Sequence, residues 1–423
     1  MSKSINLKSF NKFLKSETSG GIILLCCVVI SLVIANSPLS QSFELLLNQK
    51  IGYSSATLHL NYSISGWIND GLMAVFFLMV GLEIKRELVE GELSSPKKAA
   101  LPILAALGGV LTPAFIYFLF NNGLPTAKGW GTPMATDIAF AIAIISLLGK
   151  RVPASLRIFL AALAIVDDLM AILVIAIFYT SEIHFVNLAY AGAFWTLLII
   201  FNKIGIKKLA FYLIPAVFIW YFIHHSGIHA TIAGVLTALT LPTTPNAKES
   251  PLEKLEHILF KPVNFLIMPL FALSNTNIRF ENGMTDGLIS PLGLGIILGL
   301  VIGKPLGITF FSWFSTKIGI AKLPSGSKWK HIFGAGILGG IGFTMSIFVA
   351  ILSFSQDATL LAEAKFAILS ASLLAGTTGA IYLILVDKRT SKKPTSILTN
   401  STEKEQETAE AVGTPNLIPQ STL

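Results

Sequence analysis

Apolar stretches of about 20 residues recur along almost the whole chain, and short polar segments separate them. A helix needs about 20 apolar residues to cross the hydrocarbon layer of a bilayer. The pattern therefore predicts an all-α, polytopic membrane domain and excludes a single soluble core. We place twelve spans, near residues 20–37, 66–84, 99–120, 131–149, 156–179, 184–202, 208–224, 227–241, 258–277, 288–313, 332–354 and 360–386.

Charge supports this interpretation and adds an orientation. Only 13% of the residues are charged, against about 25% in a soluble domain. Lysine and arginine in short loops favour the cytoplasmic side. With the amino terminus inside, 26 of the 31 basic residues fall in cytoplasmic segments, and the exceptions are Lys50, Lys128, Arg279, Lys304 and Lys365. We therefore expect both termini in the cytoplasm, and we attribute the net charge of +8 to topology, not to nucleic-acid binding.

The chain divides into three predicted parts. Residues 1–19 mix lysines with large apolar residues, which predicts an amphipathic segment on the cytoplasmic surface. Residues 20–386 form the twelve-span domain, and the polar residues 387–423 are expected to form a disordered cytoplasmic tail. Within the first external loop, residues 49–63 alternate apolar and polar positions, which favours a small β-hairpin over an irregular loop.

Ionisable side chains inside the predicted spans each need a reason, because one at bilayer depth costs at least about 2.5–3.5 kcal/mol. Asp70 and Glu83 lie near span ends, where a vestibule can solvate them, so structural and functional roles both stay open. Asp167 and Asp168 are adjacent in the fifth span, with long apolar runs on either side. A carboxyl site that is protonated at one pH and ionised at another can also bind a hard cation such as Na⁺ or Li⁺. Two aspartates with only a structural role would not explain why the chain bears the desolvation cost of a buried carboxylate twice.

Two spans carry signals of interruption. Gly131 and Pro133 precede Asp137 in the fourth span, which disfavours a regular helix there and leaves a half-helix end near this carboxylate. Residues 334–342 of the eleventh span are rich in glycine, which indicates either a second break or close helix packing. Lys304 is the one basic residue deep in a predicted span, and we expect it to pair with an aspartate rather than to extend to the interface.

These residues together closely resemble the NhaA family of bacterial sodium/proton antiporters. The resemblance covers most of residues 10–386 and rests on FFLMVGLEIKREL (76–88), PMATDIAFA (133–141), LAIVDDL (163–169), HATIAG (229–234), IGKPLGI (302–308) and GIGFTMSIF (340–348). The blocks add His229 and Gly342 to the candidate residues.

The resemblance implies a fold and a site. Its fold has inverted-topology repeats, with the fourth and eleventh of twelve spans unwound at mid-membrane. Asp168 and Asp167 are implied to bind the cation and the protons, with Thr136 nearby. Asp137 is implied to compensate the facing half-helix ends, and Lys304 to pair with Asp167.

The resemblance also implies an activity, that of a transporter and not an enzyme, which needs no cofactor. Such a protein expels cytoplasmic Na⁺ or Li⁺ in exchange for external protons, is electrogenic, and is activated at alkaline pH. It is implied to lie in the bacterial inner membrane as a homodimer joined through the hairpin at residues 49–63. The residues implied in pH regulation, at the cytoplasmic mouth, are Glu83, Glu87, Lys254, Glu256 and His257.

Two other classes of protein also place aspartates in membrane spans. An intramembrane hydrolase or transferase needs a further carboxylate motif, such as Gly-x-Gly-Asp or Asp-x-x-x-Asp, and the sequence contains neither. A passive cation channel would dissipate a sodium gradient without moving protons. Proton movement coupled to sodium therefore separates an antiporter from a channel.

Overall fold

The computed structural model describes residues 17–391, apart from 56–58, 181, 244–249 and 281–283. Nearly all of the predicted amphipathic segment at the amino terminus lies outside the described residues. So does most of the predicted tail, although the last helix, α18, runs to Ser391, past the boundary expected at residue 386. The extension is short and consists of residues that a helix tolerates.

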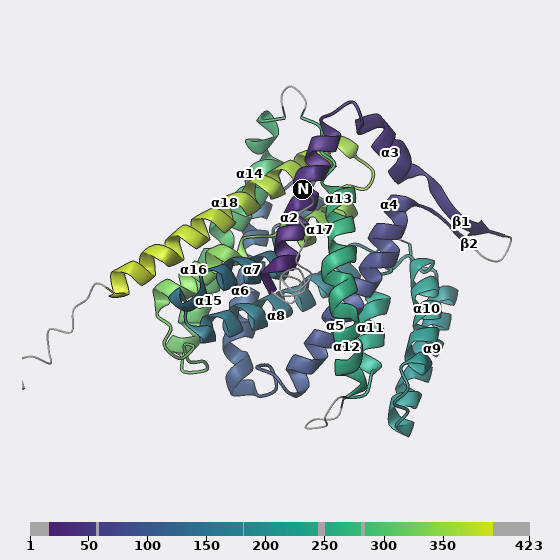
Figure 1. Ribbon diagram of the computed structural model, residues 1–423, viewed down its shortest axis with the longest axis horizontal. Coiled ribbons are helices and arrows are strands. Elements are labelled where there is room, and N and C mark those ends of the chain that lie inside the picture. Colours follow the sequence, from purple (N-terminus) through teal and green to yellow (C-terminus); the bar gives the residue numbers. More distant parts are fainter. Residues whose placement is uncertain (1–16, 56–58, 181, 244–249, 281–283, 392–423) are drawn as a thin grey trace, which may run out of the picture.

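Helices make up most of the described chain (Figure 1). The α-helices are α2 (Glu17–Ala35), α3 (Ser40–Asn48), α4 (Ile64–Gly66), α5 (Met73–Val89), α6 (Pro96–Asn121), α7 (Ile138–Leu147), α8 (Ala154–Phe178), α9 (Phe185–Ile204), α10 (Ala210–His224), α11 (Ile232–Thr240), α12 (Pro251–Pro262), α13 (Met268–Asn275), α14 (Pro291–Leu298), α15 (Lys304–Lys317), α16 (Trp329–Gly339), α17 (Phe343–Ser353) and α18 (Ala358–Ser391). Three π-helical segments are η1 (Trp67–Leu72), η4 (Val263–Ile267) and η6 (Gly299–Gly303), and the 3-10 segments are η2 (Pro125–Gly131), η3 (Gly149–Arg151) and η5 (Asp286–Leu288).

Within the described residues, seven continuous helical runs are long and apolar enough to cross a membrane. They are 64–89, 96–121, 154–178, 185–204, 251–275, 291–317 and 358–387. Two bent pairs raise the number to nine if each is one span: α2 with α3, bent by 112°, and α16 with α17, bent by 46°. Large apolar side chains such as Val33, Phe115 and Ile214 are exposed on outward faces, as lipid contact requires. The chain is therefore a multi-pass membrane protein.

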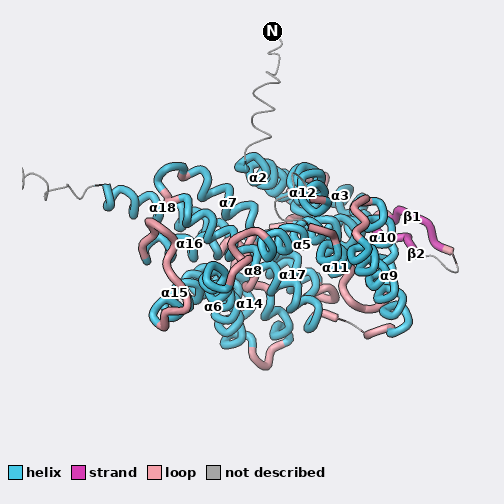
Figure 2. Tube along the Cα trace, turned by 90° about the horizontal axis from the view of Figure 1, so that it is seen from below, coloured by secondary structure: helices cyan, strands magenta, loops and turns pink. Residues whose placement is uncertain are grey.

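The predicted hairpin is confirmed as a small antiparallel sheet. Strand β1 (Lys50–Ser54) pairs with β2 (His59–Ser63), with Lys50 opposite Ser63 and Ser54 opposite His59. The sheet projects from one side of the bundle, beside α9 and α10, while α18 lies at the opposite side (Figures 1 and 2). We call the upper end of the bundle in Figure 1, where α3 and the sheet lie, the hairpin end.

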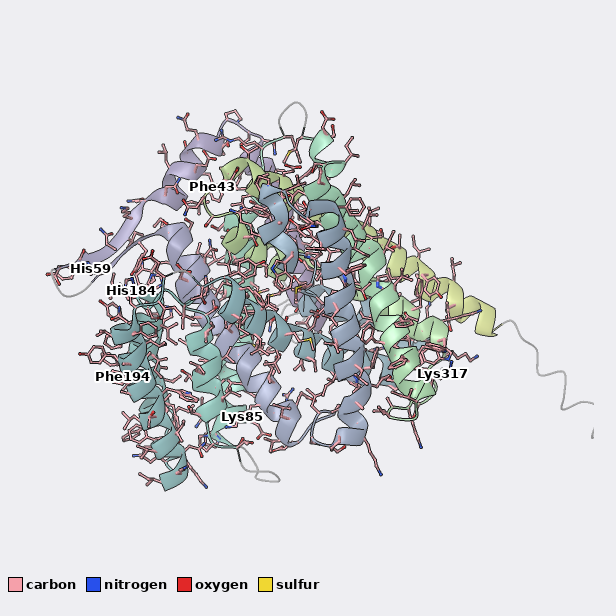
Figure 3. All side chains as sticks on the ribbon, turned by 180° about the vertical axis from the view of Figure 1, so that it is seen from behind. Phe43, His59, Lys85, His184, Phe194 and Lys317 are labelled. Carbon is pink, nitrogen blue, oxygen red and sulfur yellow. The ribbon has the colours of Figure 1, made fainter. Side chains whose placement is uncertain are left out.

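Two basic side chains, Lys85 and Lys317, lie toward the other end of the bundle. Figure 3 shows Lys85 and Lys317 far from Phe43 and His59, which lie at the hairpin end. The ammonium group of Lys85 donates to the carbonyl oxygens of Leu239 (2.7 Å) and Leu241 (2.5 Å), so it satisfies the last turn of α11. Helix α8, which carries the aspartate pair, is the most buried of the seven long spans, so its aspartates lie inside the bundle.

Glycines permit a close helix crossing between α6 and α15. A Cβ atom on Gly108 would lie 2.3 Å from the carbonyl oxygen of Gly307, and one on Gly307 would lie 2.1 Å from that of Gly108. Small residues allow backbones in membranes to approach this closely, which gains van der Waals contact. The crossing holds α15, and with it Lys304, against α6.

Gly108→Ala should therefore destabilise the fold, because the new methyl group meets a backbone carbonyl that cannot rotate away. Overpacking of this kind costs about 1–3 kcal/mol, which should lower the thermal unfolding midpoint in detergent. Gly192→Ala on α9 is the matched control, since no atom lies within 4 Å of a Cβ there. Equal midpoints in the two variants would contradict a tight crossing.

Candidate cation site

Asp137 stands where an irregular segment meets α7. Residues 135–137 have no regular structure and follow the turn at 132–134, where Pro133 has no backbone N–H group to donate. Asp137 is the N-cap of α7, and its Oδ1 atom accepts a hydrogen bond from the backbone N–H of Phe140 at 3.2 Å. The carboxylate thus satisfies a free N–H group in the first turn of α7.

The same carboxylate caps a second helix. Residues 340–342 separate α16 from α17, and the backbone N–H of Asp137 donates to the carbonyl oxygen of Ile341 at 2.6 Å. Oδ2 of Asp137 accepts from the backbone N–H of Thr344 at 3.1 Å and from the Thr344 hydroxyl. Asp137 therefore places one negative charge at the N-termini of α7 and α17, where the helix dipoles favour it.

Gly342 lies in the bend before α17. A Cβ atom there would lie 2.1 Å from the hydroxyl oxygen of Ser346 and 3.1 Å from Cδ2 of Leu300. A larger residue would have to displace one of these buried side chains. Glycine thus allows the Ser346 and Leu300 side chains to pack closely against the break.

Asp167 is held by a buried lysine. Lys304 Nζ lies 2.6 Å from Oδ2 of Asp167 and 3.0 Å from the hydroxyl oxygen of Thr136, and both Lys304 and Asp167 are completely buried. Thr136 in turn donates to the carbonyl oxygen of Gly339 at 2.8 Å. Lys304 therefore joins α8 to the irregular segment before α7 and to the end of α16.

Each aspartate keeps one unsatisfied oxygen. The Oδ1 atoms of Asp167 and Asp168 are buried and accept no hydrogen bond from the described residues. Buried polar atoms without a partner are rare and call for an explanation. Carboxylate oxygens are ligands that hard cations such as Na⁺ and Li⁺ prefer, so the donor set fits an ion of this kind.

A cavity of about 220 Å³ reaches one of the two aspartates. Its polar lining consists of Glu83, Asp137, Asp168, Asn264 and Thr344, and the rest is apolar or glycine. Asp167, Thr136 and Lys304 do not line it. An ion that entered this cavity would therefore meet the carboxylate of Asp168 before that of Asp167.

The residues implied at the mouth divide into two sets. Glu87 and Glu256 are joined through Arg86, which lies 3.5 Å from Glu87 and hydrogen bonds to Glu256. Glu83 lies within electrostatic range of all three. Lys254 and His257 are exposed on α12.

His229 lies apart from the aspartate pair, on the chain just before α11. Its Nε2 atom is 3.5 Å from Oδ1 of Asp70, its Nδ1 atom is 2.9 Å from the Thr231 hydroxyl, and its ring packs edge-on against Phe348. Asp70 lies in η1 at the start of the long span that begins at the hairpin. The pair thus belongs to the hairpin end of the bundle.

Three residues of this region, Thr344, Asn264 and Arg86, were not among the predicted site residues. Thr344 lies two positions after Gly342, the last glycine of the break, where a capping partner is expected. Asn264 is an amide within an otherwise apolar run, and Arg86 follows Glu83 by three positions, which puts both on one helix face. These signals were present but are weaker than a charge in mid-membrane.

A family model described as Na⁺/H⁺ antiporter 1 matches residues 11–383. The chain is 64% identical over 389 residues to the Na⁺/H⁺ antiporter NhaA 2 of Flavobacterium johnsoniae, covering 92% of this chain and 95% of that protein. It is 49% identical over 379 residues to the Na⁺/H⁺ antiporter NhaA of Dechloromonas aromatica, covering 89% and 95%.

Among solved structures, the sodium proton antiporter MjNhaP1 of Methanocaldococcus jannaschii matches 91% of this chain and 97% of its own. The TM-score is 0.47 and the sequence identity is 16%, a likeness that by itself does not establish a shared fold.

Proposed function

Because the chain belongs to the Na⁺/H⁺ antiporter 1 family, we propose that it is an electrogenic antiporter that expels cytoplasmic Na⁺ or Li⁺ in exchange for external protons. The observation that carries this proposal is the division of the aspartate pair. Asp168 faces a cavity with one oxygen unsatisfied, whereas Asp167 is tied to Lys304. One carboxylate is thus accessible to an ion, and the other is coupled to a group that bears a proton.

The proposed mechanism is competition between cation and protons for one site. At alkaline cytoplasmic pH few protons compete, so Na⁺ binds Asp168 with Asp167 and Thr136 nearby. The protein then opens to the outside, protons displace the ion, and the protonated site returns. The same competition accounts for activation at alkaline pH and inactivity at acid pH.

Electrogenic exchange needs a second proton, and either Asp167 or Lys304 can carry it. A cation that attracts the Asp167 carboxylate would weaken its 2.6 Å bond to Lys304, and the freed ammonium could then lose its proton. The charge moved per cation in Lys304→Gln decides between them. Undiminished charge movement would exclude the lysine as carrier.

We further propose twelve spans, with both termini in the cytoplasm. The seven long runs and two bent pairs give nine, and the shorter helices α7, α10 and α11 add three. Spans four and eleven would then be the discontinuous ones, meeting at Asp137. Labelling of single cysteines in the loops with an impermeant thiol reagent tests this orientation.

The remaining proposals concern assembly and regulation. Strand β1 is exposed along its length, β2 is partly exposed, and β1 has an edge that pairs with no other described strand, which suits a homodimer contact in the inner membrane. Mass determination of a variant without residues 50–62 tests it, and an unchanged dimer would contradict it.

Glu83, Glu87 and Glu256, linked through Arg86, are proposed to adjust the pH response, with Lys254 and His257 on the same surface.

Everted vesicles that hold a pH gradient, acid inside, test the exchange itself. Added Na⁺ or Li⁺ should collapse the gradient and K⁺ should not, with larger responses at alkaline pH. Vesicles without the protein are the control. No proton movement on Na⁺ addition would contradict antiport, and sodium flux without proton movement would indicate a channel.

A further inference from the structure

The cavity that reaches Asp168 contains a further oxygen with no assigned role. Asn264 lies in the π-helical segment η4, which interrupts the span 251–275 between α12 and α13. Such π-helical turns are frequent at functional sites. Few polar side chains line this cavity, so each is open to a direct test of its role.

The amide orientation of Asn264 is fixed by its neighbour. Its Nδ2 atom donates to the carbonyl oxygen of Phe260 at 2.9 Å, and since a carbonyl can only accept, the amide cannot be flipped. The side-chain oxygen, Oδ1, accepts no hydrogen bond from any described residue. Gly20 leaves space beside it, because even a Cβ atom there would stay 4.0 Å from Oδ1. The oxygen is therefore free to bind a cation.

Elimination among the lining groups leaves few oxygens for a passing ion. Asp137 uses both of its oxygens on the helix N-termini, and Thr344 donates its hydroxyl hydrogen to Asp137. The lining side-chain oxygens that are engaged neither with Asp137 nor with a helix N-terminus are those of Glu83, Asn264 and Asp168. Of these three, only Asn264 supplies an oxygen ligand that carries no proton at any physiological pH.

We propose that Asn264 binds the partly hydrated Na⁺ in this cavity before it reaches Asp168, and so sets the affinity of the inward-facing site. This rests on the proposed antiport function and adds a residue to its cation route. The neutral carbonyl oxygen replaces one water molecule of the ion at every pH. The two carboxylates, in contrast, exchange the ion for protons.

Two substitutions test the role with opposite expected results. In Asn264→Ala, the KM for Na⁺ should rise about three- to tenfold, the loss expected for one net polar contact that a water molecule can partly replace, while kcat stays within about twofold. This rise should be the same at pH 7 and pH 8.5. In Asn264→Asp the KM should fall at alkaline pH and depend more steeply on pH, because a carboxylate attracts the cation but also binds protons.

Asn202 provides the matched control. Its amide also donates to a backbone carbonyl, that of Thr240 at 2.6 Å, but it lies on α9 outside the cavity. Asn202→Ala and Asn202→Asp should leave the KM for Na⁺ unchanged. A KM unchanged in both Asn264 variants, or a lower kcat at constant KM, would overturn the proposal and indicate a structural role.

Direct binding separates this inference from the antiport proposal. Calorimetric titration of the purified protein with NaCl measures the Kd without exchange, and Asn264→Ala should raise it by the same factor as the KM. A protein that binds Na⁺ with this dependence but moves no protons would overturn antiport alone. Antiport with a Kd that is indifferent to Asn264 would overturn the role of Asn264 alone.

Discussion

In Asp168→Asn, Na⁺-driven proton movement should fall to the level of vesicles without the protein. The amide is nearly isosteric with the carboxylate, so packing inside α8 is preserved. It has no charge to offer the cation and no proton to exchange. Loss of a charged ligand worth roughly 3 kcal/mol alone lowers affinity on the order of 100-fold, and loss of the exchangeable proton removes the coupling.

The controls for this variant separate charge from fold. Asp286→Asn removes a carboxylate from an exposed position in η5 and should keep full activity. Asp168→Glu keeps the charge on a longer side chain and should retain measurable exchange with a raised KM. Residual exchange in Asp168→Asn comparable with that in the glutamate variant would show that the ion binds elsewhere.

The fold was predictable from the sequence where the environment permits only a few backbone structures. A bilayer forces backbone groups into helices, so long apolar runs identify spans directly, and alternation at 49–63 identified the hairpin. The 112° bend between α2 and α3 and the three π-helical segments were not predicted. A π-helical turn changes the hydrogen-bond partner of a few residues but leaves the apolar composition unchanged.

The candidate residues were found for a related reason. A charge at membrane depth is costly, which makes Asp137, Asp167, Asp168 and Lys304 conspicuous in an apolar sequence. Neutral polar residues cost less and attract no such attention. Thr344, which completes the cap shared by two helices, was therefore passed over, since its role depends on which helix ends meet in space.

The division between the aspartates also needed the structure. Adjacent residues on a helix point about 100° apart, so one of Asp167 and Asp168 can face a cavity while the other faces a neighbouring helix. The sequence alone does not tell which of the two aspartates faces the cavity, because that depends on the position of α15. The contact of Lys304 with Asp167, and the cavity beside Asp168, supply that information.

Lys304→Ala should strongly destabilise the protein. The same substitution at a solvent-exposed lysine would have only a weak effect. Both members of the pair are completely buried, and removal of the lysine leaves the Asp167 carboxylate without its cation and the Thr136 hydroxyl without its donor. Breaking a buried ion pair on one side costs about 3–5 kcal/mol. The thermal unfolding midpoint in detergent, followed by tryptophan fluorescence, measures this loss.

A double variant distinguishes loss of the pair from loss of packing. Asp167→Asn removes the stranded charge, so Asp167→Asn with Lys304→Gln should recover most of the stability that Lys304→Ala loses, since replacing both partners of a buried pair is often nearly neutral. Lys304→Gln alone should remain destabilised, because the carboxylate stays unpaired. If the double variant unfolded as early as either lysine variant, the lysine would contribute mainly by filling space between α15 and α8. Recovery of stability without recovery of exchange would place the pair in the transport cycle as well as in the fold, because the ion would then meet a stable site that cannot exchange its protons.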